Sequence, residues 1–159
     1  MSATKNSDPA LSLTLGRLND DPAKAYRCFV LARAPEELAS TVEKLQSVLL
    51  KGEYDLFVAR SSFELMALRA VDEAGLFLEH FREVPGLDSP ILRFARFLCA
   101  ALGEGSQTLF RFLLVKYETS IRRDPGLGLY LSRLSKVFFG EALSEETSTV
   151  GSVLKELFT

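Results

Sequence analysis

The sequence contains no tryptophan, one histidine and two cysteines among its 159 residues. Protein zinc sites use paired spacings such as Cys-x-x-Cys or His-x-x-x-His, and the chain has neither. We therefore expect no metal and no cofactor, and we expect His80 to be a partly exposed histidine near a helix end. Cys28 and Cys99 lie far apart in apolar helical stretches, which favours two buried free thiols in a reducing compartment.

Long hydrophobic runs are also missing. The longest wholly apolar stretch, 97–102, is too short for a bilayer, which takes about 20 residues, and so is the stretch 112–115. The first nine residues are polar and have no signal-peptide character. The sequence therefore predicts a soluble, cytosolic protein without direct membrane insertion.

An excess of charge of one sign is the third absence. The chain has 19 Lys and Arg against 21 Asp and Glu, and the basic residues are scattered. Nucleic-acid binding draws on clustered cations, so we expect no nucleic-acid partner. With 47% hydrophobic and 25% charged residues, the composition is that of an ordinary folded protein, and the length fits one domain.

What the chain does contain is helical periodicity. Between prolines and glycines the apolar residues recur at intervals of three and four, whereas period-two alternation and Asn-Gly or Asp-Gly turns are missing. An aspartate N-cap followed by proline opens several segments, at Asp8, Asp21 and Asp124. About eight helices are expected, over 9–18, from 22 onward, and over 35–51, 54–71, 72–82, 90–102, 107–121 and 125–139.

The expected fold is all-α, an α-solenoid of stacked antiparallel helix pairs, with an irregular helical bundle as the alternative. Residues 1–8 are expected to be a disordered tail and residues 9–141 the helical-repeat domain. Residues 142–159 are expected to be a second tail that is polar over 144–149 and ends in a short docking helix. The apolar residues of that last segment are Val150, Val153, Leu154, Leu157 and Phe158.

Catalytic motifs are poorly represented. The chain has no Gly-x-Ser-x-Gly elbow, and Gly103-Glu104-Gly105 lacks the rest of a nucleotide-binding fingerprint, so it is expected to connect helices. The acidic pairs Asp20-Asp21 and Glu145-Glu146 have no visible acid-base partner, which favours solvated or capping roles. We therefore expect a protein that is not an enzyme.

The most compact charged feature is Arg122-Arg123-Asp124-Pro125. Arg122 and Arg123 lie at the C-terminal end of one helix, where their positive charges interact favourably with the helix dipole. Asp124 can cap the next helix, so a structural role explains the motif. The alternative is that the arginines dock an acidic partner. The twelve phenylalanines are a second feature, because they exceed what one face of each helix can bury and so indicate a groove for a partner segment.

The stretch 90–158 resembles the Golgi-to-ER-traffic protein 4 family, and a weaker resemblance extends upstream to about Leu11. The residues that carry the stronger part are Leu92-Arg93-Phe94, Phe97-Leu98, Leu109-Phe110, Tyr117, Ser120-Ile121-Arg122-Arg123-Asp124-Pro125, Tyr130-Leu131, Leu134 and Val137-Phe138-Phe139-Gly140. Its most specific elements are Arg-Arg-Asp-Pro and the closing Phe-Phe-Gly. Upstream, Tyr54-Asp55-Leu56-Phe57-Val58-Ala59 is similar to the start of a helix in that family.

The resemblance implies a non-catalytic α-solenoid scaffold of the GET pathway, which inserts tail-anchored proteins into the ER membrane after translation. In that family the N-terminal half holds a targeting ATPase, and the C-terminal half binds a ubiquitin-like subunit or a BAG6-like protein. This chain resembles only the C-terminal half. We therefore expect partner binding, and we expect the ATPase-docking surface to be absent.

The same resemblance places a partner-binding surface on the loop before residue 90 and the helix after it. The candidate residues are Phe81, Val84, Leu87, Ile91, Phe94 and Phe97. Their periodicity equally fits core packing. The loop over 84–90 is shorter than the family's frequent insertion there, which implies a reduced clamp on the partner.

Two rival functions stay open at this point. One is a generic helical-repeat interaction module of another pathway, whose resemblance reflects shared solenoid packing. The other is a small-molecule binder or enzyme with a pocket between helices, which a buried carboxylate or His80 in a polar cavity would support.

Overall fold

The computed structural model describes residues 8–50, 52–141 and 143. Within these residues the protein has nine α-helices, one short 3₁₀ helix and no strand, which confirms the all-α prediction. The elements are α1 (Pro9–Leu18), α2 (Pro22–Leu31), α3 (Pro35–Leu45), η2 (Gln46–Val48), α4 (Tyr54–Ala67), α5 (Val71–His80), α6 (Pro90–Glu104), α7 (Gln107–Lys116), α8 (Glu118–Ile121) and α9 (Leu127–Phe139).

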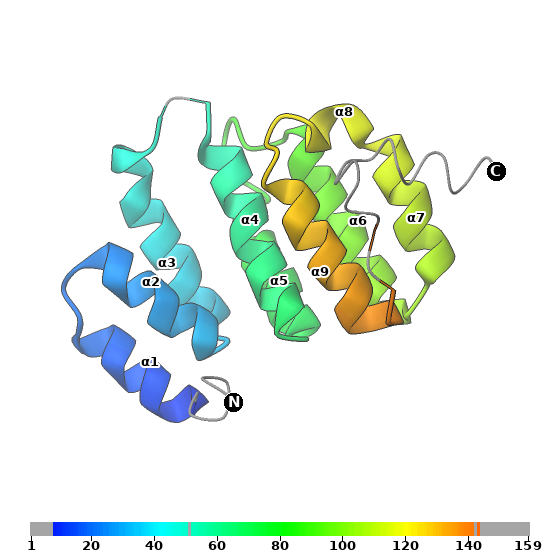
Figure 1. Cartoon of the computed structure of the whole chain (residues 1–159). Helices are drawn as coiled ribbons and strands as arrows, with labels where there is room; N and C mark the ends of the chain where they lie inside the picture. Colours follow the sequence, from blue (N-terminus) through cyan, green and yellow to red (C-terminus); the bar gives the residue numbers. More distant parts are fainter. Residues whose placement is uncertain (1–7, 51, 142, 144–159) are drawn as a thin grey trace.

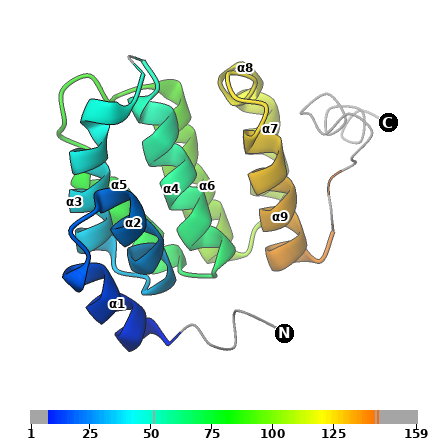
Figure 2. The same cartoon turned by 60° about the vertical axis from the view of Figure 1, so that its left-hand side comes forward.

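The helices stack in two layers, as expected for a solenoid. In Figure 1, α2, α4 and α9 form the layer nearer the viewer, and α3, α5 and α6 lie behind them. The stack ends with α1 against α2 on one side, as Figure 2 also shows, and with α7 against α6 on the other. Most helices pack against their neighbours in the chain, but α3 packs on α5 rather than on α4, and α9 returns to pack on α4.

Helix α4 lies at the centre of the molecule because it packs against α2, α5, α6 and α9. Its side chains Phe63, Leu65 and Met66 are fully buried although they point in different directions around the helix. A helix with little polar surface needs neighbours on several sides, and here α9 supplies the last of them. The position of α9 therefore completes the core.

The predicted helix starts are confirmed where aspartate precedes proline at α1 and α2. Asp8 accepts a hydrogen bond from the Ala10 amide, and Asp21 accepts one from the Ala23 amide, each at 3.0 Å. Asp124 differs from the prediction, because its carboxylate accepts from the Gly126 amide at 2.9 Å in a turn that precedes the helix. Helix α9 therefore begins at Leu127, two residues later than expected.

Several predicted helix ends are wrong. The helix from Pro35 ends at Leu45 rather than at 51, because its last turn tightens into η2. The single helix expected over 107–121 is divided at Tyr117, whose ring packs against Phe94 at 5.5 Å. Helix α6 runs through Gly103 and ends before Gly105, which adopts a left-handed φ of 69°.

The predicted division of the chain into a domain and two tails stays a prediction. Of the two tails, Asp8 is the N-cap of α1, and residues 1–7, 142 and 144–159 lie outside the described residues. The expected docking helix with Val150 to Phe158 is among them. No helix in the described part of the chain has both the length and the apolar character to cross a membrane.

Candidate protein-binding surface

The six residues predicted to bind a partner divide into core and surface. Four of them, Phe81, Leu87, Ile91 and Phe94, are buried inside the chain. Val84 is half-buried, and Phe97 is 50% exposed. The surface part of the prediction therefore rests on Val84 and Phe97 alone.

The buried members of this set hold α5 and α6 in place. The ring of Phe81 lies 5.2 Å from Phe77 and 6.2 Å from Tyr54, measured between centroids, so it joins the end of α5 to α4. Phe94 likewise packs edge-on against Phe63 of α4 at 6.1 Å. Core packing, the alternative explanation of their spacing, accounts for these positions.

Exposed aromatic surface gathers instead on α6 and α7, which pack side by side. Phe97 of α6 is 50% exposed and Phe112 of α7 is 56% exposed. The half-buried Tyr117 follows α7, and its ring centroid lies 6.4 Å from that of Phe97. We call Phe97 and Tyr117 the aromatic face, and Phe112 is the exposed aromatic residue of the neighbouring helix α7. The sequence does not single out Phe112, because every side of this helix is apolar in the sequence and its buried side cannot be identified.

The arginine of the Arg-Arg-Asp-Pro motif that faces inward is Arg123. Its guanidinium donates to both carboxylate oxygens of Asp55, at 2.7 and 3.2 Å, and to the Gly52 carbonyl at 3.2 Å. Burial alone would raise the pKa of Asp55, but the hydrogen bonds and charge of Arg123 hold that pKa below its usual value. The ion pair therefore joins the turn before α9 to the start of α4.

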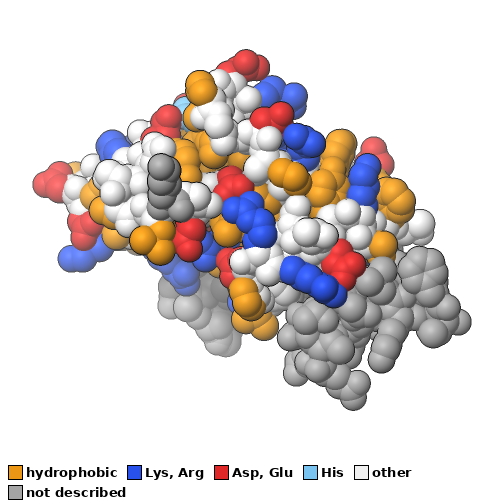
Figure 3. Space-filling model, turned by 90° about the horizontal axis from the view of Figure 1, so that it is seen from above, with side chains coloured by type: hydrophobic (Ala, Val, Ile, Leu, Met, Phe, Trp, Pro, Cys, Tyr) orange, Lys and Arg blue, Asp and Glu red, His pale blue; other side chains and the backbone are white. Residues whose placement is uncertain are grey.

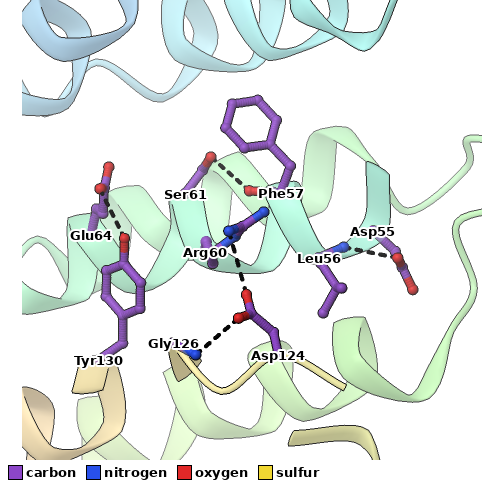
Figure 4. Close-up of polar contacts among 9 residues, drawn as sticks. All are labelled: Asp55, Leu56, Phe57, Arg60, Ser61, Glu64, Asp124, Gly126 and Tyr130. Atoms are coloured by element: carbon purple, nitrogen blue, oxygen red, sulfur yellow. Dashed lines mark hydrogen bonds and ion pairs between the residues drawn. The ribbon is translucent and has the colours of Figure 1, made fainter. Parts of the chain in front are cut away.

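The rest of the motif is also engaged within the chain. Figure 4 shows Asp124 between Arg60 of α4, at 3.3 Å, and the Gly126 amide. Arg122 pairs with Glu118 one turn earlier, and Pro125 is exposed. Because both arginines already have carboxylate partners, the geometry favours the structural explanation of the motif over docking of an acidic partner.

The Phe138-Phe139-Gly140 element anchors the other end of α9. The Arg69 guanidinium lies 5.2 Å from the Phe138 ring centroid and donates to the Val137 carbonyl at 2.6 Å. Phe139 packs against Phe110 of α7 at 5.4 Å, and Gly140 ends the helix with a φ of 73°. The two motifs thus fix α9 at both of its ends.

A polar cluster that the sequence does not reveal lies between α2, α4 and α9. Glu64 of α4 accepts hydrogen bonds from Tyr26 at 2.8 Å and from Tyr130 at 3.2 Å, and Ser61 lies 2.9 Å from the Tyr26 hydroxyl (Figure 4 shows Glu64, Tyr130 and Ser61). Burial, together with the Glu64 charge, raises the pKa of Tyr26. Glu64 and Asp55 are therefore both hydrogen-bonded within the chain, as buried polar groups usually are.

An open groove of about 690 Å³ runs between α5 and α6. Its lining includes the small residues Gly75, Cys99, Ala100 and Gly103, together with Leu76. The Cys99 thiol donates to the Val71 carbonyl at 3.2 Å. Burial, with a smaller contribution from the Asp72 charge, raises the pKa of that thiol to about 11, so Cys99 is a poor nucleophile at neutral pH. Both cysteines are free; Cys99 is buried as predicted, whereas Cys28 is only partly buried.

In the described residues, His80 does not belong to a metal-binding cluster. His80 is exposed at the end of α5, and its Nε2 lies 3.1 Å from a Glu43 carboxylate oxygen. No group of three or more His, Cys, Asp or Glu side chains in the described part of the chain could hold a metal ion. Figure 3 looks down on the top of Figure 1, the side on which α8 lies. On this side the apolar side chains form small groups separated by charged ones.

Comparisons with known proteins agree with this fold. The family model described as Golgi to ER traffic protein 4 matches residues 1–158. The human Golgi to ER traffic protein 4 homolog is 32% identical over 125 residues, which are 74% of this chain and 38% of that protein. The Dictyostelium discoideum homolog is 34% identical over 89 residues, which are 55% of this chain and 29% of that protein.

A crystal structure described as C. therm. Get4 has the same fold. It superimposes with a TM-score of 0.72 at 21% sequence identity, over 96% of this chain and 56% of that one. The chain thus spans little more than a third of the length of the human relative. The match of the family model over nearly the whole sequence settles its membership: the chain belongs to the Golgi to ER traffic protein 4 family.

Proposed function

We propose that this protein is a non-catalytic adaptor of the GET pathway, which inserts tail-anchored proteins into the ER membrane after translation, and that it works in the cytosol. Its partner is a ubiquitin-like subunit or a BAG6-like protein of that pathway. Family membership supports the pathway, and the two-layer helical stack supports a role in protein binding.

The observation that carries the binding role is the aromatic face. Large aromatic side chains dominate the energetics of protein interfaces when a partner can cover them. Phe97 and Phe112 are each about half exposed on neighbouring helices, and Val84 is half-buried in the loop before α6. The partner-binding surface therefore comprises Val84 and the aromatic face, while Phe81, Leu87, Ile91 and Phe94 support it from the core.

The two rival functions have less support. Shared solenoid packing is no longer needed to explain the resemblance, because the family model matches residues 1–158. A small-molecule site would be supported by a buried carboxylate or by His80 in a polar cavity, and Asp55 is buried, but its carboxylate already has a partner within the chain. Asp55 is bound by Arg123, Glu64 by two tyrosines, and His80 is exposed.

The test is co-expression of the full chain with the ubiquitin-like GET subunit of the same organism, and separately with its BAG6-like protein. Light scattering after size-exclusion chromatography measures complex formation. Phe97→Asp places a charge in the apolar part of the interface and should weaken binding by at least about tenfold.

Leu129→Asp provides the matched control, because Leu129 is a 71% exposed apolar residue on a different helix, α9. It should leave binding unchanged. The proposal fails if neither partner forms a complex with the unmodified chain. The assignment of the surface fails if Phe97→Asp and Leu129→Asp bind equally well.

A further inference from the structure

The groove between α5 and α6 has the form of a receptor for a short helix. Its floor is built from small side chains, so another backbone can approach closely. A Cβ added to Gly75 would lie 3.7 Å from the Cys99 sulfur, and one added to Gly103 would lie 3.7 Å from Val71, which are ordinary contacts at the bottom of the groove. Beside this floor Leu76 is 63% exposed, more than a leucine on a packed helix usually is.

Charge differs between the two ends of the groove. Asp72 and Glu104 lie at the end where α5 begins and α6 finishes, and Arg82 and Arg96 lie toward the opposite end. Arg82 pairs with Glu79 at 2.7 Å. Arg96 has a buried Nε without a hydrogen-bond acceptor among the described residues. A buried donor without a partner is costly, so an acceptor entering the groove near Arg96 would be stabilised.

The chain itself carries a segment with matching properties. Residues 150–158 lie outside the described residues, but their apolar members Val150, Val153, Leu154, Leu157 and Phe158 have the spacing of one helix face. As a helix, nine residues would be about 13 Å long, close to the length of α5 that lines the groove. The apolar face of such a helix fits a floor of small residues.

The end of the described chain lies within reach of the groove. Glu141, just after α9, accepts hydrogen bonds from Gln107 at 2.8 Å and from Arg111 at 2.9 Å, at the start of α7. Gln107 follows Glu104, which lines the acidic end of the groove, by three residues. Six residues, 144–149, can extend over about 20 Å, which allows the segment to enter at this end.

We propose that residues 150–158 form a helix that occupies the groove between α5 and α6. The segment enters at the Asp72 and Glu104 end and finishes near Arg96. This direction puts the positive end of the helix dipole beside the two carboxylates and the carbonyl oxygens of its last turn beside Arg96. The apolar residues of the segment cover Leu76 and the small-residue floor.

Disulfide trapping in the full chain tests the proposal. In a background of Cys28→Ser and Cys99→Ser, the paired substitutions L76C and L154C put one thiol on the groove and one on the apolar face of the segment. The control pair, L76C with K155C, moves the second thiol to the opposite face of the same helix. We expect the effective concentration of the first thiol pair, measured in a glutathione buffer, to exceed that of the control at least about tenfold.

A third variant tests the role of Arg96. Adding Arg96→Gln to the first pair should reduce the effective concentration several-fold, because the acceptors of the last turn lose their cation. Far-ultraviolet circular dichroism checks that all variants are folded. Equal effective concentrations for the two pairs overturn the proposal. If residues 150–158 lay outside the groove, the thiol at position 76 would have no preference for position 154 over position 155. Disulfides that form mainly between chains also overturn it and place a second copy in the groove.

Discussion

Arg122 and Arg123 are neighbours in the chain with unequal structural roles. Arg123 is bound to Asp55, whose side chain is only 11% exposed, whereas Arg122 pairs with Glu118 on the surface. Replacing Arg123 by glutamine leaves the Asp55 carboxylate without its cation. We expect a loss of about 2 kcal/mol in the free energy of unfolding, below the usual cost for a fully buried pair because Arg123 is 39% exposed.

The matched variant Arg122→Gln should cost less than about 0.5 kcal/mol, because an exposed pair one helical turn apart contributes little. Urea unfolding of both variants at neutral pH makes the comparison. Equal losses would show that the ion pair between Arg123 and Asp55 stabilises the fold no more than a surface pair does.

Acid should remove the contribution of the ion pair between Arg123 and Asp55 to the free energy of unfolding. Since the folded-state pKa of Asp55 lies below its unfolded value, the ion pair stabilises the protein above the unfolded pKa, and the stabilisation is lost as the pH falls through the folded pKa. The stability difference between the unmodified protein and Arg123→Gln should therefore shrink as the pH is lowered below about 4, near the ordinary aspartate pKa. A constant difference over that range would contradict the assignment.

At the scale of elements, α1 packs on α2 with no room for a side chain at Gly16. A Cβ at this position would lie 2.6 Å from Cε1 of the buried Phe29 ring. Gly16→Ala should therefore destabilise the protein by about 1–3 kcal/mol, although alanine is the better helix former. Gly103→Ala is the control, because its Cβ finds ordinary contact distance, so this variant should be neutral or slightly stabilised. Thermal unfolding of both tests the difference, and equal melting temperatures would contradict it.

Helix starts are more predictable than helix ends in this chain, for a physical reason. The N-caps of α1 and α2 require an aspartate side chain, which is visible in the sequence. The turns after α2 and α4, however, use Arg33 and Arg69 in left-handed conformations, with φ of 54° and 63°. Glycine is the residue that normally marks such ends, so an arginine at these positions does not reveal them. Arg69 is held there by its contacts with Val137 and Phe138, which are distant in the chain.

The binding surface is only partly predictable because periodicity does not distinguish the core from a groove. Phe94 and Phe97 are three residues apart on one helix, yet the first is fully buried and the second half exposed. Which of them faces outward depends on the positions of α4 and α7. The same limit hides the Glu64 cluster, since its tyrosines come from α2 and α9, and it hides the groove beside Leu76.

For the whole molecule, stability should decline from the centre of the stack toward α1. Helix α4 is covered by four other helices, whereas α1 packs on α2 and keeps Leu11, Leu15 and Leu18 largely exposed. Hydrogen–deuterium exchange measured by mass spectrometry should therefore show the amides of α1 exchanging at least about tenfold faster than those of α4. Equal rates would mean that α1 opens only when the entire protein unfolds.

The return of α9 onto α4 has a consequence for how the protein is made. A ribosome releases α4 well before it releases α9, so the side of α4 that will hold Tyr130 first meets water. During that interval α1 to α6 can assemble, but their apolar surface is still open to other nascent chains. This side of α4 therefore stays open to wrong contacts until α9 has emerged and docked, so the last helix to form is also the one that closes the core.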